Sequence, residues 1–99
     1  MTDQASHDRF KNAMLSIYEL GKSETSYNAT RFLQMVHEKG GVQTAKDLLS
    51  GDPSAVSEGF ANLALKGRLD LSVEALVLKD EWKHLFTSRE LSIAKRRLK

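Results

Sequence analysis

The hydrophobic positions of this 99-residue chain recur at steps of three and four, a spacing that predicts helices along its whole length. The clearest stripe predicts a first helix over about residues 5–21. We expect Gly21 and the polar residues that follow it to end this helix. Its predicted inward side chains are Phe10, Ala13, Met14, Ile17 and Tyr18.

The next apolar stripe predicts a second helix, with Phe32, Leu33 and Val36 on its inner face. We expect Asn28 to cap this helix, because a short polar side chain accepts hydrogen bonds from the free amides of a first turn. Gly40 suits the left-handed conformation that closes a helix, and Gly41 lets the chain reverse tightly. The predicted result is an antiparallel hairpin with a short third helix. The third helix has Val42, Ala45, Leu48 and Leu49 as its apolar positions.

Residues 44–63 have the pattern of a helix-turn-helix motif, with Ala45, Gly51 and Val56 at the packing and turn positions. Asp52 and Pro53 together predict the start of a fourth helix that ends at Gly67. We expect this helix to bury Val56, Phe60, Leu63 and Ala64. It opens with acid and carries one lysine at its far end, which is a poor surface for a phosphate backbone. We therefore interpret the pair as a helical corner that forms part of the core.

The C-terminal third carries two further start signals. A fifth helix is expected from Asp70 or Ser72, with Leu71 and Leu76 packed together across a Ser72 cap. Residues 80–86 predict a short helical turn. Residues 87–90 then match a capping box, which opens a last helix with Leu91, Ala94 and Leu98 facing inward. The predicted fold is all-α: a compact bundle of five or six short helices, including a helix-turn-helix-like corner, in one domain over 1–99 with frayed residues at 1–4 and 99.

Composition and charge narrow the function classes. The chain has no cysteine, which excludes disulfides and thiolate metal sites. Its N-terminus does not have the pattern of a signal peptide, and no apolar run is long enough to span a bilayer, so we expect a cytoplasmic protein without a membrane partner. Residues 89–99 hold five basic residues and one acidic residue, whereas residues 1–88 hold ten basic and twelve acidic residues. The basic surplus therefore belongs to the last helix.

Three segments carry a resemblance: residues 27–33 (YNATRFL), residues 67–77 (GRLDLSVEALV) and residues 85–87 (LFT). With them the chain, from about Arg9 to Leu98, resembles a recurrent family of small helical proteins from bacteria and bacteriophages. The resemblance implies a bacterial or phage-borne cytoplasmic helical protein. It implies no activity, cofactor or catalytic residue.

No constellation of residues predicts catalysis. Asp70 and Glu74 are four residues apart and would suit acid–base chemistry in a cleft, but their place at a helix start gives them a structural explanation. Arg68 is expected to pair with Asp70 or with a neighbouring helix. His84 follows Asp80 by four residues, yet a third metal ligand is not evident. We expect no enzyme activity, no catalytic residue, no cofactor, no metal and no small-molecule substrate.

Two functional hypotheses remain. The first is a non-enzymatic interaction module that binds another protein or a second copy of itself, in a bacterial defence, phage or toxin–antitoxin setting. Its candidate interface residues are the aromatics Tyr27, Trp82 and Phe86. The alternative is a nucleic-acid-binding protein that uses its basic last helix, supported by the helix-turn-helix-like pair. Its candidate contacts are Arg89, Lys95, Arg96, Arg97 and Lys99.

Overall fold

The computed structural model describes residues 4–51 and 56–98, and within them it contains six α-helices, two short 3₁₀ helices and no strand. The helices are α1 (Gln4–Thr25), α2 (Thr30–Lys39), α3 (Gly41–Leu48), α4 (Glu58–Leu65), η1 (Leu69–Leu71), α5 (Val73–Val77), η2 (Lys83–Leu85) and α6 (Ser88–Arg97). The predicted all-α bundle is confirmed.

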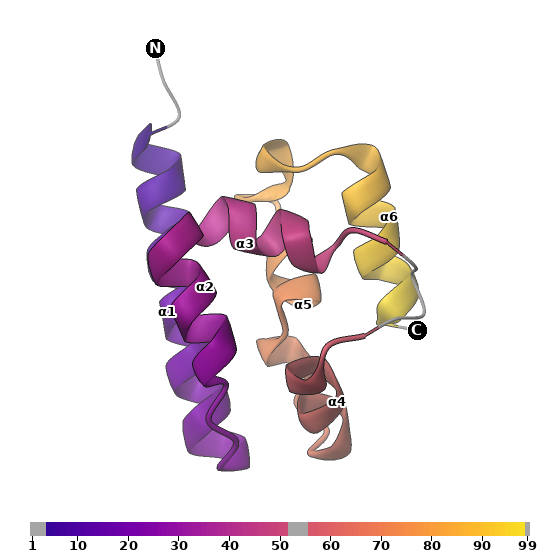
Figure 1. Cartoon of the computed structure of the whole chain (residues 1–99). Coiled ribbons are helices and arrows are strands. Elements are labelled where there is room, and N and C mark those ends of the chain that lie inside the picture. The colour runs from indigo at the N-terminus through magenta and orange to yellow at the C-terminus, as the bar shows by residue number, and fades with distance from the viewer. Residues whose placement is uncertain (1–3, 52–55, 99) are drawn as a thin grey trace.

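Helices α1 and α2 form an antiparallel pair on one side of the molecule (Figure 1). Helix α3 leads from this pair across to the other side, where α4, α5 and α6 lie. Contacts of α3 with α1 and α2, and of α1 with α4 and η1, hold the two sides together, while α5 and α6 pack against each other within the second side. Residues from both ends of the sequence therefore share one core.

The core is centred on Phe10 of α1, which is fully buried. Its ring makes edge-to-face contacts with Trp82 and Phe86, at centroid distances of 5.3 and 5.4 Å. The other residues of this cluster come from α1, α2, α3 and its C-cap, α5, η2 and α6, and comprise Met14, Val36, Ala45, Leu49, Val73, Leu76, Val77, Leu85, Ile93 and Ala94. The predicted stripe of α1 is confirmed, since Phe10, Met14 and Tyr18 are its buried residues.

The predicted end of the first helix is wrong. Helix α1 continues through Gly21 to Thr25, and the chain leaves it at Ser26, which has a φ of 63°. The Ser26 amide donates to the Lys22 carbonyl, and the Thr25 hydroxyl donates to the Gly21 carbonyl. A glycine costs a helix interior only about 1 kcal/mol, so packing and these bonds carry the helix past it.

The predicted cap at Asn28 is also wrong. Helix α2 begins at Thr30 after Ala29, which makes no capping bond through its side chain. The side chain of Asn28 instead accepts a hydrogen bond from the Tyr18 hydroxyl at 2.6 Å. Asn28 thus fastens the connection to α1 and does not start α2.

The Gly40–Gly41 turn does not make an antiparallel hairpin. Gly40 has a φ of 86°, and α3 begins at the next residue, so α3 crosses α2 steeply (Figure 1). A helical hairpin needs a loop of two or more residues, which this junction does not have. Gly41 allows α3 to approach α1, because a Cβ there would lie 2.8 Å from the Lys11 Cα.

The tight helix-turn-helix corner is not present. Helix α3 ends at Leu48 and α4 begins at Glu58, a separation that exceeds the three or four residues of such a turn. Ser57 caps α4, with its hydroxyl accepting from the Phe60 amide, so the helix starts later than Pro53 predicts. Asp52 and Pro53 themselves lie outside the described residues. Val56 and Ala64, both predicted to be buried, are exposed.

The later start signals are confirmed. Ser72 caps α5 by accepting from the Ala75 amide. Thr87 and Glu90 form the predicted capping box of α6. The helical turn predicted within residues 80–86 is the 3₁₀ helix η2.

Candidate functional site

The main candidate site is a pocket of about 430 Å³ between the α1–α2 pair and the segment from α4 to α5. Its volume lies in the range of pockets that take ligands or partner side chains. We call it the α1–α4 pocket. Its lining comprises Ile17, Tyr18, Gly21, Lys22, Thr25, Tyr27, Ala29, Arg31, Phe32, Met35, Leu48, Ser57, Glu58, Gly59, Phe60, Leu63, Leu71, Ser72, Val73 and Glu74.

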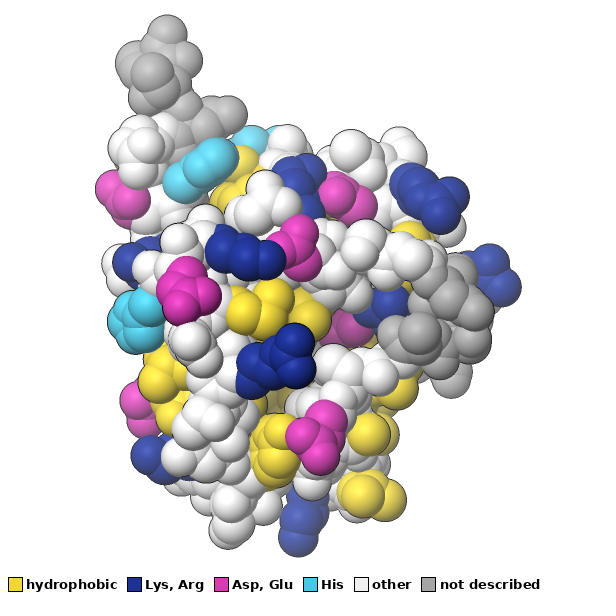
Figure 2. Space-filling model, viewed as in Figure 1, with side chains coloured by type: hydrophobic (Ala, Val, Ile, Leu, Met, Phe, Trp, Pro, Cys, Tyr) yellow, Lys and Arg dark blue, Asp and Glu magenta, His cyan; other side chains and the backbone are white. Residues whose placement is uncertain are grey.

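The walls of this pocket are lined by apolar side chains. A closed core would bury these side chains. Ile17, Phe32, Met35, Leu48 and Leu63 are each only partly buried. They lie on four different helices, so the opening is a gap in the packing between elements. Hydrophobic atoms are visible in the space between α2 and α4, with basic and acidic side chains beside them (Figure 2).

Helix α4 forms one wall of the pocket and is weakly embedded in the fold. Apart from Glu58 and Asn62 it consists of glycine and apolar residues, yet Phe60 is its one buried residue. Leu65 at its end is 85% exposed, and Leu20 on α1 is about half exposed. Neither leucine lines the α1–α4 pocket, but both leave apolar area of the two helices that wall it in contact with water.

A hydrogen bond spans the two sides of the pocket. The hydroxyl of Tyr27, in the α1–α2 connection, donates to Oε1 of Glu58 at 2.7 Å. This bond to a carboxylate, together with burial and the negative charge of Glu58, raises the pKa of the Tyr27 phenol above its ordinary value of 10.0. Tyr27 and Glu58 join α4 to the α1–α2 pair across 31 residues of sequence.

Two cations line the pocket without an ion-pair partner in the part of the chain that the structure describes. Lys22 lies in the last turn of α1 and Arg31 in the first turn of α2, and both are exposed. They contrast with Lys39, Lys46 and Arg68, which are all ion-paired.

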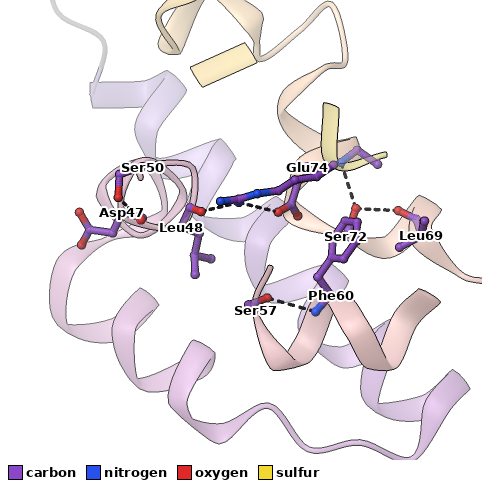
Figure 3. Close-up of polar contacts among 10 residues, drawn as sticks. Asp47, Leu48, Ser50, Ser57, Phe60, Leu69, Ser72 and Glu74 are labelled. Carbon is purple, nitrogen blue, oxygen red and sulfur yellow. Dashed lines mark hydrogen bonds and ion pairs between the residues drawn. The ribbon is translucent and has the colours of Figure 1, made fainter. Parts of the chain in front are cut away.

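Glu74 also lines the pocket, and its negative charge is neutralised by an ion pair with Arg97. Glu74 Oε2 accepts from Arg97 Nη1 at 3.0 Å, and the same nitrogen donates to the Leu48 carbonyl at 2.6 Å. Figure 3 shows Glu74 pointing toward the end of α3, where Leu48 lies. Both side chains of the pair are at most 5% exposed. The ion pair ties α5, α6 and α3 together at the pocket wall to which Glu74 and Leu48 contribute.

The residues predicted for nucleic-acid contact do not share one environment. Arg89, Lys95 and Arg96 lie on the exposed face of α6, as a phosphate-binding surface requires. Arg97 does not, because its guanidinium is buried in the ion pair with Glu74. Lys99 lies outside the described residues.

The three aromatic residues predicted to form a protein interface also differ in their exposure. Trp82 and Phe86 are wrong as exposed anchors, since both are buried against Phe10 in the core. Arg9 and Lys46 lie over their rings, at 5.9 and 5.4 Å from the centroids. Tyr27 is partly exposed and lines the α1–α4 pocket.

The polar residues considered for acid–base or metal chemistry form hydrogen bonds and ion pairs within the protein. Arg68 donates from two nitrogens to the two carboxylate oxygens of Asp70, each at 3.1 Å, and also pairs with Glu24. The hydrogen bonds from Arg68 lower the pKa of the Asp70 carboxyl. Asp80 pairs with Lys83 at 3.4 Å. Within residues 4–51 and 56–98, no three His, Cys, Asp or Glu side chains are grouped to hold a metal ion.

The helices that the structure describes include none with the length and apolar character needed to cross a membrane. No protein-family model, curated protein sequence or solved structure matches this chain. The α1–α4 pocket was not predicted from the sequence. The one local signal for it was the unusually apolar composition of α4, which the helical pattern alone assigns to the core.

Proposed function

We propose that this chain is a non-enzymatic helical module that binds a protein partner by accepting apolar side chains in the α1–α4 pocket. The carrying observation is the pocket itself, walled by partly buried large apolar residues from four helices. Burying such area yields about 25 cal/mol per Å², so a partner that covers it gains affinity from surface already exposed to water.

The chemistry of the pocket supports binding over catalysis. Glu74, the carboxylate inside it, is neutralised by Arg97, and the hydroxyl of Ser72 donates to the Leu69 carbonyl while accepting from the Ala75 amide. Neither group is paired with a histidine or another base that would activate it. These polar groups hold the walls in place and leave the apolar lining available.

Gly59 offers a direct test of the proposal. It lines the pocket from α4, and a Cβ at this position would meet nothing closer than the Ser57 hydroxyl at 3.9 Å. Gly59→Leu should therefore fill pocket volume without disturbing the helix. Gly59→Ala makes the same backbone change with a single methyl, and Ser92→Leu adds an equal side chain to the exposed face of α6.

The experiment is a selection of random displayed peptides on the wild-type protein, followed by affinity measurement on the three variants. We expect enriched peptides with bulky apolar residues, which lose affinity for Gly59→Leu and keep it for Gly59→Ala and Ser92→Leu. Failure to enrich any sequence, or equal binding to Gly59→Leu, would contradict the proposal. A mass that rises with concentration and falls in Gly59→Leu would identify the partner as a second copy of this chain.

A second candidate function is nucleic-acid binding through α6, and the exposed position of Arg89, Lys95 and Arg96 supports it. Contacts of this kind give affinity that depends steeply on salt. The test is binding to random-sequence duplex DNA at low salt. We expect Lys95→Ala/Arg96→Ala to abolish it and Lys22→Ala/Arg31→Ala, which removes equal charge elsewhere, to weaken it far less. No binding by the wild-type protein at micromolar concentration would exclude this function.

A further inference from the structure

We infer that the segment received by the α1–α4 pocket is acidic as well as apolar: a short stretch of a partner protein that places carboxylates beside its apolar anchor. This inference rests on the proposed function and adds the charge of the partner. It follows from the balance of charged groups that line the pocket.

Four charged residues line it: Lys22, Arg31, Glu58 and Glu74. Of the two carboxylates, Glu74 is neutralised by its ion pair with Arg97. Glu58 accepts a hydrogen bond from the neutral hydroxyl of Tyr27 and keeps its negative charge. The two cations have no ion-pair partner among the described residues, so they outnumber the one unneutralised carboxylate and the lining carries a surplus positive charge.

The placement of these cations suits recognition at the opening. Lys22 and Arg31 extend from helices α1 and α2, on the side of the pocket that faces α4, and both are exposed. An apolar anchor on the inner walls would leave its flanking residues near them. Carboxylates in those flanks would gain two ion pairs, one of them with an arginine that can bind both carboxylate oxygens.

The nearest other charged cluster lies outside the pocket lining. Glu24 lies near Lys22 in sequence, but it is paired with Arg68, which also holds Asp70. The cluster of Arg68, Glu24 and Asp70 does not line the pocket. It carries one surplus negative charge, which lies outside the opening and is screened by solvent.

The test uses two synthetic peptides with identical leucine and phenylalanine residues at helical spacing. One peptide carries Glu at the other positions and the second carries Lys. Binding is measured by fluorescence anisotropy at low and at high salt. We expect the wild-type protein to prefer the acidic peptide by about tenfold at low salt, equivalent to about 1.4 kcal/mol, with a smaller preference at high salt.

Two double variants with the same net charge distinguish attraction of the acidic peptide to Lys22 and Arg31 from attraction to the overall charge of the protein. Lys22→Glu/Arg31→Glu should reverse the preference toward the basic peptide. Lys95→Glu/Arg96→Glu, which changes two exposed cations of α6, should leave the preference for the acidic peptide in place. Equal effects of the two variants would show that overall charge decides, and would overturn the inference.

Other outcomes are equally decisive. If both peptides bind alike and Gly59→Leu abolishes both, the apolar pocket functions as proposed and the inferred charge preference is wrong. If neither peptide binds at about 1 mM, the inference fails for peptides of this class. If dodecanoate displaces the acidic peptide and binds more tightly, the natural occupant is a lipid-like anion and the inference of a protein segment is overturned.

Discussion

Arg97 shows how burial changes the role of a residue. In the sequence it belongs to a basic run with Lys95 and Arg96, and its neighbours are exposed as that run suggests. The helical period turns Arg97, unlike Lys95 and Arg96, toward α5 and the end of α3. There Glu74 and the Leu48 carbonyl accept its hydrogen bonds. A buried charge of this kind is tolerated because it is paired with a carboxylate and hydrogen-bonded.

We predict that Arg97→Met destabilises the protein by about 3–5 kcal/mol, since it leaves the Glu74 carboxylate buried without the cation that pairs with it. Glu74→Leu should also destabilise the protein, because the buried guanidinium of Arg97 loses a charged acceptor. The double variant should lose less than either single one, because it removes both charges. Urea unfolding followed by circular dichroism would measure all three. Asp70→Asn is the control at an exposed ion pair and should have little effect. A double variant that loses the sum of the two single losses would contradict this account.

Glu90 provides a prediction about pH. Burial raises the pKa of its carboxyl, but the hydrogen bond from the Thr87 amide and the contact with Lys46 outweigh burial, and the net pKa lies below the ordinary 4.5. The folded state therefore binds fewer protons than the unfolded state, and this stability is present above about pH 4.5 and lost as the pH falls through the folded pKa. The stability difference between wild type and Glu90→Gln should be constant above that pH and shrink below it. Unfolding curves at a series of pH values would measure it, and a difference that grows on acidification would refute the assignment.

At the scale of the helices, the positions of the glycines and the ends of the elements do not always coincide. Gly21 lies inside α1, four residues before its last residue, while the left-handed position that follows the helix is occupied by Ser26. Gly41, by contrast, is required by the close approach of α3 to α1. The capping hydroxyls of Ser57, Ser72 and Thr87 mark the helix starts more faithfully than the glycines mark the ends.

We predict that Gly21→Ala stabilises the protein by up to about 1 kcal/mol, because alanine is the better helix former and its Cβ would meet Leu63 Cδ2 at an ordinary 3.8 Å. Ser26→Gly should add about 0.5–1 kcal/mol by relieving a left-handed backbone at a non-glycine residue. Thermal or chemical unfolding of each variant would measure these gains. A loss of stability in Gly21→Ala would indicate that the helix needs flexibility there.

Gly41→Ala should destabilise the protein, in contrast to Gly21→Ala. Its Cβ would lie 2.8 Å from the Lys11 Cα and 3.2 Å from the Phe10 ring, so α3 would have to move away from α1. We expect a cost of about 1–3 kcal/mol. Gly59→Ala is the matched control, since the position is open and also helical, and it should be neutral or stabilising. Equal effects at the two glycines would refute the close-packing explanation.

At the scale of the molecule, the aromatic contacts of Phe10 join the first helix to the segment before the last one. The chain has a single tryptophan, Trp82, and it lies at this junction. Because one continuous core includes residues from α1 to α6, we expect the two sides of the bundle to unfold together.

We predict coincident unfolding transitions by tryptophan fluorescence and by far-ultraviolet circular dichroism. Phe10→Ala should move both transitions by the same amount and cost about 3–5 kcal/mol, because the ring is fully buried. Separate transitions by the two probes would show that the α1–α2 pair and the C-terminal helices form independent units.

The sequence by itself determined the features that depend on neighbours along the chain. Spacing of apolar residues predicted the helices and the inward stripe of α1, and the residue types at positions 72 and 87–90 predicted the caps of α5 and α6. These features are local: a cap needs only the next turn of the same helix, and a stripe needs only the helical period.

The tertiary structure decided what depends on neighbours across the fold. It placed Trp82 and Phe86 in the core, paired Arg97 with Glu74, and left a pocket between α1 and α4. An apolar helix such as α4 has the same sequence pattern whether its partners close over it or leave a gap. Which of the two occurs depends on how closely helices distant in sequence pack, and only their arrangement in space fixes that.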